Sequence, residues 1–188
     1  MIPYIYKQYQ SLVIDNADGV FSKDNLNKCI QSQKLIENAD SLFFIGNGGS
    51  HASCCLHLVE DFVKVANKKA YTLENPSLIS CLENDYPHDE VYVEWLKRFW
   101  VTDNSLLIAI SSSGESNNII NAVNYIKKDN GKSITLSAHK STNRLALLGD
   151  INFHIPTKNY GAAETYHQLL LHMILDSYIE DKESVLVT

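Results

Sequence analysis

Several residue types and patterns that mark particular protein classes are missing from this sequence. Its 188 residues include four cysteines, and no two of them form the C-x-x-C pair that zinc and redox sites use. We therefore expect free thiols in a cytoplasmic protein, with Cys54 and Cys55 as small buried residues. No window approaches the roughly 20 apolar residues of a membrane span, and polar residues interrupt any apolar leader. A membrane partner is not expected.

An excess of positive charge is also missing. The chain has 16 Lys and Arg against 22 Asp and Glu, which gives a formal net charge of −6. Proteins that bind nucleic acid through its phosphates need clustered Lys and Arg, so a nucleic-acid partner is not expected. A small anion is still compatible, because a few backbone N–H groups at a helix N-terminus bind phosphate without net positive charge.

What the chain does have is an alternation of strand and helix patterns, without repeats or a Pro/Gly/Ser-rich linker. Such alternation predicts an α/β fold, a three-layer doubly wound parallel sheet with helices on both faces. We expect one domain over 1–188, with N-terminal helices in 1–40 and the α/β sandwich in 41–188. The two N-terminal helices should pack outside the sandwich or against a partner chain. Expected helices are 4–16, 23–38 (with Ser22 as N-cap), 50–66, 88–100, 116–128 and 162–181, and expected strands are 41–46, 70–73, 105–110, 132–138 and 151–155.

Two of these strands end in small polar loops that open helices, "GNGGS" at 46–50 and "SSSGES" at 111–116. Glycine lets the backbone approach a ligand, helix N-termini present unpaired N–H groups, and serine adds donors without bulk. The pattern favours a phosphate site at the carboxyl ends of the strands. Ordinary turns with capping serines are the alternative. The first loop matches neither the Walker nor the G-x-G-x-x-G pattern, and no nucleotide cofactor is expected. Glu115 must point away from a bound phosphate.

Four segments together resemble a known family. They are "FFIGNGGSHASCCLHLVEDF", "CLENDY", "LLIAISSSGESNNIINAV" and "AETYHQLLLHMI". The serine loop is similar to the phosphate loop of the SIS (sugar isomerase) domain, whose sheet is flavodoxin- or Rossmann-like. The four segments in this order resemble the sedoheptulose-7-phosphate (phosphoheptose) isomerases, over roughly 40–180.

The resemblance implies a role for each matching position. The phosphate would be held by the serines of the second loop, and the sugar chain would lie along the first loop and a neighbouring connection. Counted from Ser50 without a gap, Glu60 falls on the family's catalytic glutamate, and His172 falls on its catalytic histidine. The implied substrate-binding residues are Asn47, Gly48, Gly49, Ser50, Asn84, Asp85, Ser111, Ser112, Ser113, Ser116 and Glu164.

A carboxylate and an imidazole suit aldose–ketose isomerisation, because a proton must move between C1 and C2 while the oxygens also exchange protons. Glu60 is the expected base and His172 the expected acid, although the roles could be reversed. Several family members also bind zinc through a histidine four residues before the glutamate, and Leu56 stands there in this chain.

A slip of one residue restores a pair at i, i+4 in His57 and Asp61, with Asp61 in place of the glutamate. A Zn²⁺ site is therefore a candidate, and the alternative is that these histidines lie at a surface or an interface. Its possible ligands are His57, Asp61, Glu164, His167 and His172.

The resemblance implies a cytoplasmic enzyme that isomerises a phosphorylated sugar, most specifically sedoheptulose 7-phosphate for surface polysaccharides. It also implies a homotetramer with sites at subunit boundaries. Two alternatives remain open, a non-catalytic phosphosugar-binding regulator and an isomerase of another phosphosugar. His51, His88, His139 and His154 join no comparable group in the sequence, and His88 is expected in a loop.

Overall fold

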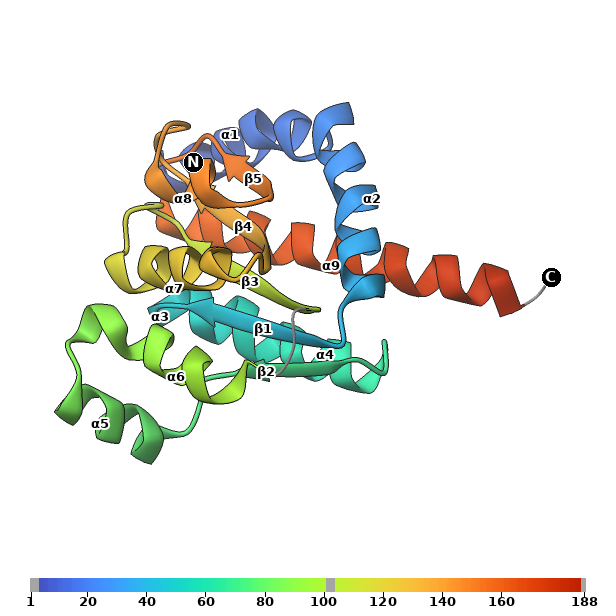
Figure 1. The fold of residues 1–188 in the computed structure, drawn as a ribbon. Helices are drawn as coiled ribbons and strands as arrows, with labels where there is room; N and C mark the ends of the chain where they lie inside the picture. Colours follow the sequence, from blue (N-terminus) through green and yellow to red (C-terminus); the bar gives the residue numbers. More distant parts are fainter. Residues whose placement is uncertain (1–3, 101–103, 187–188) are drawn as a thin grey trace.

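A parallel sheet forms the centre of the molecule in the computed structural model, which describes residues 4–100 and 104–186 (Figure 1). In these residues the sheet has five strands in the order β2-β1-β3-β4-β5. The predicted parallel α/β architecture is confirmed. The strands are β1 (Ser41–Gly46), β2 (Lys69–Thr72), β3 (Ser105–Ser111), β4 (Lys132–Ala138) and β5 (Ile151–Ile155).

Helices cover both faces of this sheet (Figure 1). α2, α4 and α9 lie on one face, and α5, α6, α7 and α8 lie on the other. Their bounds are α1 (Tyr4–Val20), α2 (Lys23–Asn38), α3 (Gly48–Ser50), the π-helix η1 (His51–Leu56), α4 (His57–Lys64), α5 (Pro76–Asp85), the 3-10 helix η2 (His88–Glu90), α6 (Val91–Phe99), α7 (Asn117–Lys128), α8 (Arg144–Leu148) and α9 (Tyr160–Leu186).

Strand β1 shows why the sheet needs two helical layers. All six of its residues are buried, and successive side chains of a strand point to opposite faces. Leu42 and Phe44 belong to the core under α4 and α9, whereas Phe43 and Ile45 belong to the core under α6 and α7. Burying one such side chain stabilises the fold by about 1.5–3 kcal/mol, so both faces of β1 drive helix packing.

Of the two N-terminal helices, α2 does not pack outside the sandwich as the sequence predicted. α2 lies within the sandwich, because Cys29 and Ile36 join the core beside α9. Ser22 caps α2 as expected, since its hydroxyl accepts from Asn25 N at 3.3 Å. α1 contacts α9 and β5. It leaves other apolar side chains exposed, among them Tyr6 at 70% and Ile14 at 60%.

Three helical features were not expected. α5 and α8 are short helices between the predicted elements, and each begins after an asparagine that caps it: Asn75 accepts from Leu78 N and Asn143 from Ala146 N. The predicted helix 50–66 is real but irregular, because a π-helical stretch interrupts it at His51–Leu56. In the described parts of the chain, no helix combines the length and apolar character needed to cross a membrane.

Candidate active site

The serine loop connects β3 to α7, and glycine shapes its turn. Gly114 has a φ of +67°, a left-handed conformation that favours glycine. A Cβ at this position would also collide with the side chain of Asn143. Asn143 is itself buried and donates to Ala138 O at 3.1 Å. The loop therefore packs against the side-chain amide of Asn143, which is hydrogen-bonded to the end of β4.

The hydroxyls of the loop face one another. Ser111 Oγ lies 3.0 Å from Ser116 Oγ and 3.4 Å from Ser113 Oγ, and it accepts from Gly114 N at 3.2 Å. Ser112 Oγ is buried without a hydrogen-bond partner in the described structure. Ser116 occupies the N-cap position of α7, yet its side chain does not cap that helix. A buried hydroxyl without a partner is unfavourable, so the loop retains unused donors beside a helix N-terminus.

A cavity of about 130 Å³ opens beside these hydroxyls. The expected residues Asn47 and Ser50 line it from the first loop, and Glu164 lines it from α9. Gly49 makes room for that carboxylate, since a Cβ there would lie 2.5 Å from Glu164 Oε1. The complete lining is Asn47, Ser50, Ile110, Ser111, Ser112, Ser113, Ser116, Tyr160 and Glu164.

Glu115 points away from this cavity, as its charge requires. Its carboxylate accepts from Arg144 Nε at 2.7 Å and from the backbone N–H of Arg144 at 3.1 Å. Arg144 also donates to Glu115 O and to Asn117 Oδ1. The side-chain hydrogen bond from Arg144 is the main reason that the pKa of Glu115 is lowered. Arg144 thus links the serine loop to the start of α8 and compensates the negative charge of Glu115.

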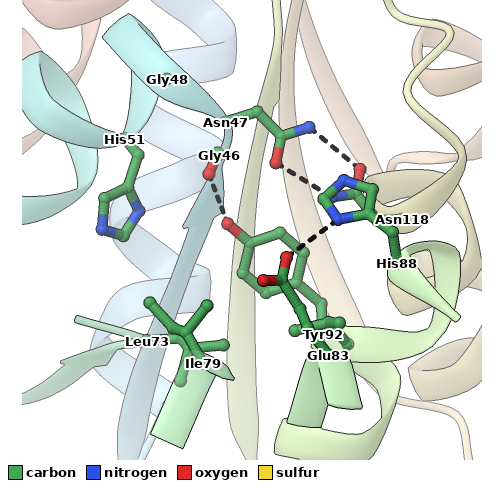
Figure 2. Close-up of a pocket in the computed structure, with 11 residues that line it drawn as sticks. Gly46, Asn47, Gly48, His51, Leu73, Ile79, Glu83, His88, Tyr92 and Asn118 are labelled. Carbon is green, nitrogen blue, oxygen red and sulfur yellow. Dashed lines mark hydrogen bonds and ion pairs between the residues drawn. The ribbon is translucent and has the colours of Figure 1, made fainter. Parts of the chain in front are cut away.

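A second cavity, of about 250 Å³, lies on the other side of Asn47, which lines both cavities. Asn47 and Asn118 exchange two hydrogen bonds, of 3.0 and 2.9 Å. His88 approaches this pair from η2, and His51 lies across the cavity (Figure 2). The cavity is lined by Gly46, Asn47, Gly48, His51, Leu73, Ile79, Glu83, His88, Val91, Tyr92 and Asn118.

His88 is a site residue that the sequence analysis did not single out. Its Nδ1 lies 3.2 Å from Glu83 Oε1, and its Nε2 lies 3.3 Å from Asn118 Nδ2. In the sequence, Glu83 and His88 lie on either side of the Tyr86-Pro87 bend, which indicates that they could be neighbours. Nothing in the sequence places His88 beside Asn118 of α7. Asn84 and Asp85, which were predicted to bind sugar, are exposed at the end of α5, where Asn84 donates to Asp85 at 2.8 Å.

Three side chains on α4 and α9 form a cluster that could hold a metal ion. One ligand atom from each of His57, Asp61 and His172 lies within 4.8 Å of the other two. Asp61 Oδ2 is 3.3 Å from His57 Nε2 and 3.9 Å from His172 Nδ1. Two imidazoles and one carboxylate are the donor set of many zinc sites that keep one position open for a ligand. The residues present therefore fit a divalent metal.

The π-helical segment explains why Asp61 rather than Glu60 faces His172. A π-helical turn holds more residues than an α-helical turn, so the side chains beyond it are displaced around the axis. An ungapped count from Ser50 leads to Glu60, whereas the observed helix turns Asp61 toward α9. Glu60 is exposed, and among the described residues His172 forms its ion pair with Asp61 and not with Glu60. Asp61 is thus the carboxylate that lies close to His172, and the catalytic role of Glu60 stays a prediction.

The other two predicted ligands lie away from the cluster. Glu164 faces the serine cavity, as described above. His167 is completely buried, with Nε2 3.1 Å from the carbonyl oxygen of Ser137 in β4. Burial lowers the pKa of His167 to about 4. The structure thus makes His167 a neutral core residue instead of a ligand, because α9 turns it toward the sheet.

Comparison with known proteins supports the resemblance to the SIS domain that the serine loop indicated. Residues 98–179 match the family model of the SIS domain. Over these residues the chain is similar to the SIS domain family.

Proteins of similar sequence include phosphoheptose isomerases. The chain is 29% identical over 147 residues to the phosphoheptose isomerase of Fusobacterium nucleatum, a match covering 76% of this chain and 74% of the relative. It is 27% identical over 186 residues to that of Glaesserella parasuis, covering 91% and 95%. The phosphoheptose isomerase structure from Neisseria gonorrhoeae has the same fold, with a TM-score of 0.82, 22% identity and coverage of 93% and 97%.

Removing Arg144 should weaken anion binding by exposing the charge of Glu115. We expect Arg144→Ala to raise the Kd for inorganic phosphate roughly fivefold at low ionic strength, because an uncompensated carboxylate then lies in the loop. The double variant Glu115→Gln/Arg144→Ala should return the Kd close to the wild-type value. Isothermal titration calorimetry measures both, and the difference should shrink in high salt. A double variant as weak as Arg144→Ala would contradict this account.

The buried His167 should make the protein less stable in acid. Because its pKa is lowered in the folded state, the unfolded chain takes up a proton that the native protein excludes. Stability should fall as the pH drops from about 6.5, the unfolded value, to about 4. The loss from this residue should reach roughly 3 kcal/mol. Urea unfolding of the wild type and of His167→Gln across this range checks it, since Gln retains a donor for Ser137 O but does not titrate. Equal slopes in the two proteins would contradict it.

Proposed function

We propose that the protein is a phosphosugar aldose–ketose isomerase that converts sedoheptulose 7-phosphate into a heptose 7-phosphate. One observation carries the proposal: the serine cavity combines a buried, unpartnered Ser112 hydroxyl with the uncapped N-terminus of α7. Such donors match a phosphate dianion. The phosphoheptose isomerases of similar sequence, over three quarters of the chain or more, support the choice of a seven-carbon sugar.

In this proposal the serine loop binds the phosphate and fixes one end of the sugar. Ser111, Ser113 and Ser116 give up their mutual contacts and donate to phosphate oxygens, joined by Ser112. Glu164 accepts a hydrogen bond from a sugar hydroxyl, because its carboxylate lines the same cavity and would repel the phosphate itself. In this proposal residues 1–188 form a single domain, and its substrate binds at the edge of the sheet where β1 and β3 end.

We assign the reacting carbons to the cluster of His57, Asp61 and His172. His57 follows Ser50 by seven residues through the π-helical stretch His51–Leu56, which rises less per residue than the 1.5 Å of an α-helix, so the two lie less than about 10 Å apart along the helix. An extended chain of seven carbons with bonds of about 1.5 Å spans on the order of 8 Å. A sugar anchored in the serine cavity is thus long enough to approach the cluster. A carboxylate and an imidazole there suit proton transfer between C1 and C2 through an enediolate.

We also propose that the cluster binds a divalent metal, with zinc as the candidate. His57, Asp61 and His172 would hold it, and when bound it would supply Lewis-acid stabilisation of the sugar oxygens at C1 and C2. The donor set and the spread of 4.8 Å support this. Glu164 and His167 are left out of the ligand set because they face other parts of the structure.

We further propose a cytoplasmic homotetramer that supplies heptose for surface polysaccharides such as lipopolysaccharide or capsule. Exposed apolar side chains along α1 support association, since Tyr6, Tyr9, Val13 and Ile14 are each about half exposed or more, from 48% to 70%. Free cysteines support a reducing compartment.

The pure protein should convert sedoheptulose 7-phosphate, as followed by NMR of the sugar. If the metal assignment holds, chelation should lower the rate and added zinc should restore it, and protein purified without a histidine tag should contain metal. Ribulose 5-phosphate and fructose 6-phosphate serve as shorter substrates. Tight phosphosugar binding with no turnover of any of the three would overturn the assignment as an isomerase and favour a phosphosugar-binding regulator.

The pair Asp61→Asn and Glu60→Gln separates the two candidate carboxylates. Asp61→Asn should lower kcat by about 100-fold or more, as expected for the loss of a group that moves protons or orients the reacting carbons. Glu60→Gln should stay near the wild-type rate, because Glu60 is exposed and its neighbour makes the contact with His172. Steady-state kinetics give the answer, with thermal melting as the control for folding. The reverse result would return the catalytic role to Glu60.

A further inference from the structure

A chain of hydrogen bonds runs from the surface of α5 to the wall between the two cavities. It begins at Glu83, passes through His88 and Asn118, and ends at Asn47 (Figure 2). Asn118 is buried at 3% exposure. Asn47, by contrast, is exposed to both cavities. Whatever orients Asn118 therefore also orients a group that can touch a ligand.

The backbone decides which way the Asn118 amide points. Its Oδ1 accepts from Ile119 N at 3.0 Å, and a backbone N–H can only donate. The nitrogen of the same amide must then face Asn47 Oδ1 at 2.9 Å and His88 Nε2 at 3.3 Å. An amide nitrogen has two hydrogens and no acceptor, so each of these neighbours must accept one.

This geometry fixes the tautomer of His88. Because Nε2 accepts from Asn118, the proton of the neutral ring lies on Nδ1 and is donated to Glu83 Oε1 at 3.2 Å. Protonated His88 would carry N–H groups on both nitrogens, and its Nε2–H would face the N–H of Asn118. The ring is exposed to solvent over 67% of its side-chain area.

We propose that His88, held by Glu83, is a positioning residue for substrate binding. In its neutral form it completes the hydrogen bonding of Asn118, and Asn118 then holds the Asn47 amide in the one orientation presented to the phosphosugar. The proposal rests on the proposed function for the identity of that ligand. Protonation of His88 removes the acceptor, loosens the Asn118–Asn47 pair and weakens binding.

The charged and titratable groups around His88 are few. Glu83 faces it from α5, His51 of η1 lies across the cavity, and Tyr92 of α6 also lines the cavity (Figure 2). Its neighbours on η2 turn toward α7 instead: Asp89 accepts from Asn117, and Glu90 accepts from Asn121. Tyr92 donates its hydroxyl to Gly46 O. Glu83 is thus the carboxylate that orients the ring.

A graded series of variants at residue 88 tests the proposal through the Kd for sedoheptulose 7-phosphate. His88→Gln keeps an acceptor and should bind within about twofold of the wild type. His88→Phe fills the space without an acceptor and should bind roughly threefold to tenfold more weakly. His88→Lys places a permanent donor beside Asn118 and should bind more weakly still. Equal Kd values across the series would overturn the proposal.

A pH comparison supplies a readout that a purely structural role would not move. Between about pH 8 and about pH 5.5, where histidine changes charge, the Kd of the wild type should rise more than that of His88→Gln. The substrate phosphate titrates over the same range in both proteins, so the difference between them isolates His88. Parallel pH profiles would count against the proposal.

Crystal structures of wild type and His88→Phe keep this inference separable from the proposed function. We expect the variant to lose the reciprocal Asn47–Asn118 bonds or to show Asn47 in more than one conformation, with the rest of the fold unchanged. An unchanged, single Asn47 conformation would overturn the positioning role even if the enzyme is an isomerase. A displaced Asn47 in a protein that turns over no sugar would uphold the positioning role and refute the isomerase.

Discussion

The parallel pairing of β1 with β3 is the interaction on which the site depends. It sets Gly46 opposite Ile110 at the carboxyl ends of the two strands. The glycine–asparagine loop and the serine loop therefore start side by side, although more than sixty residues separate them in the chain. Each then opens a helix whose N-terminal N–H groups point toward the same edge of the sheet. A slip in this register would separate the two loops and remove the shared wall at Asn47.

In the proposed anion site, negative side chains must be kept from repelling a bound phosphate. Two carboxylates lie close to the serine loop, and each is handled differently. Glu115 is turned outward and paired with Arg144. Glu164 remains in the cavity, where Gly49 leaves space for it. Binding an anion beside Glu164 requires a strong set of donors, and the unpartnered Ser112 hydroxyl and the uncapped α7 terminus supply one. The same carboxylate is suited to a sugar hydroxyl, which can donate to it.

The π-helical stretch in the helix after β1 has the largest chemical consequence of any local irregularity. It displaces the side chains of α4 around the helix axis, so that His57 and Asp61 turn toward His172 on α9. A regular helix would present a different pair of residues there. Three features of the backbone thus arrange the two cavities and the cluster. They are the register of β1 with β3, the left-handed conformation of Gly114 and the π-helical stretch His51–Leu56.

Much of this could be predicted from the amino-acid sequence, because local chemistry determined it. Apolar runs such as Leu106–Ile110 specify buried strands, and the glycine and serine loops specify turns that open helices at the strand ends. The i, i+4 spacing of His57 and Asp61 made their pairing foreseeable. The burial of His167, the exposure of Glu60 and the contact of His88 with Asn118 were decided only by tertiary structure. Which side of a helix faces the sheet depends on every turn before it and on the packing of distant elements, and no short stretch of sequence encodes that.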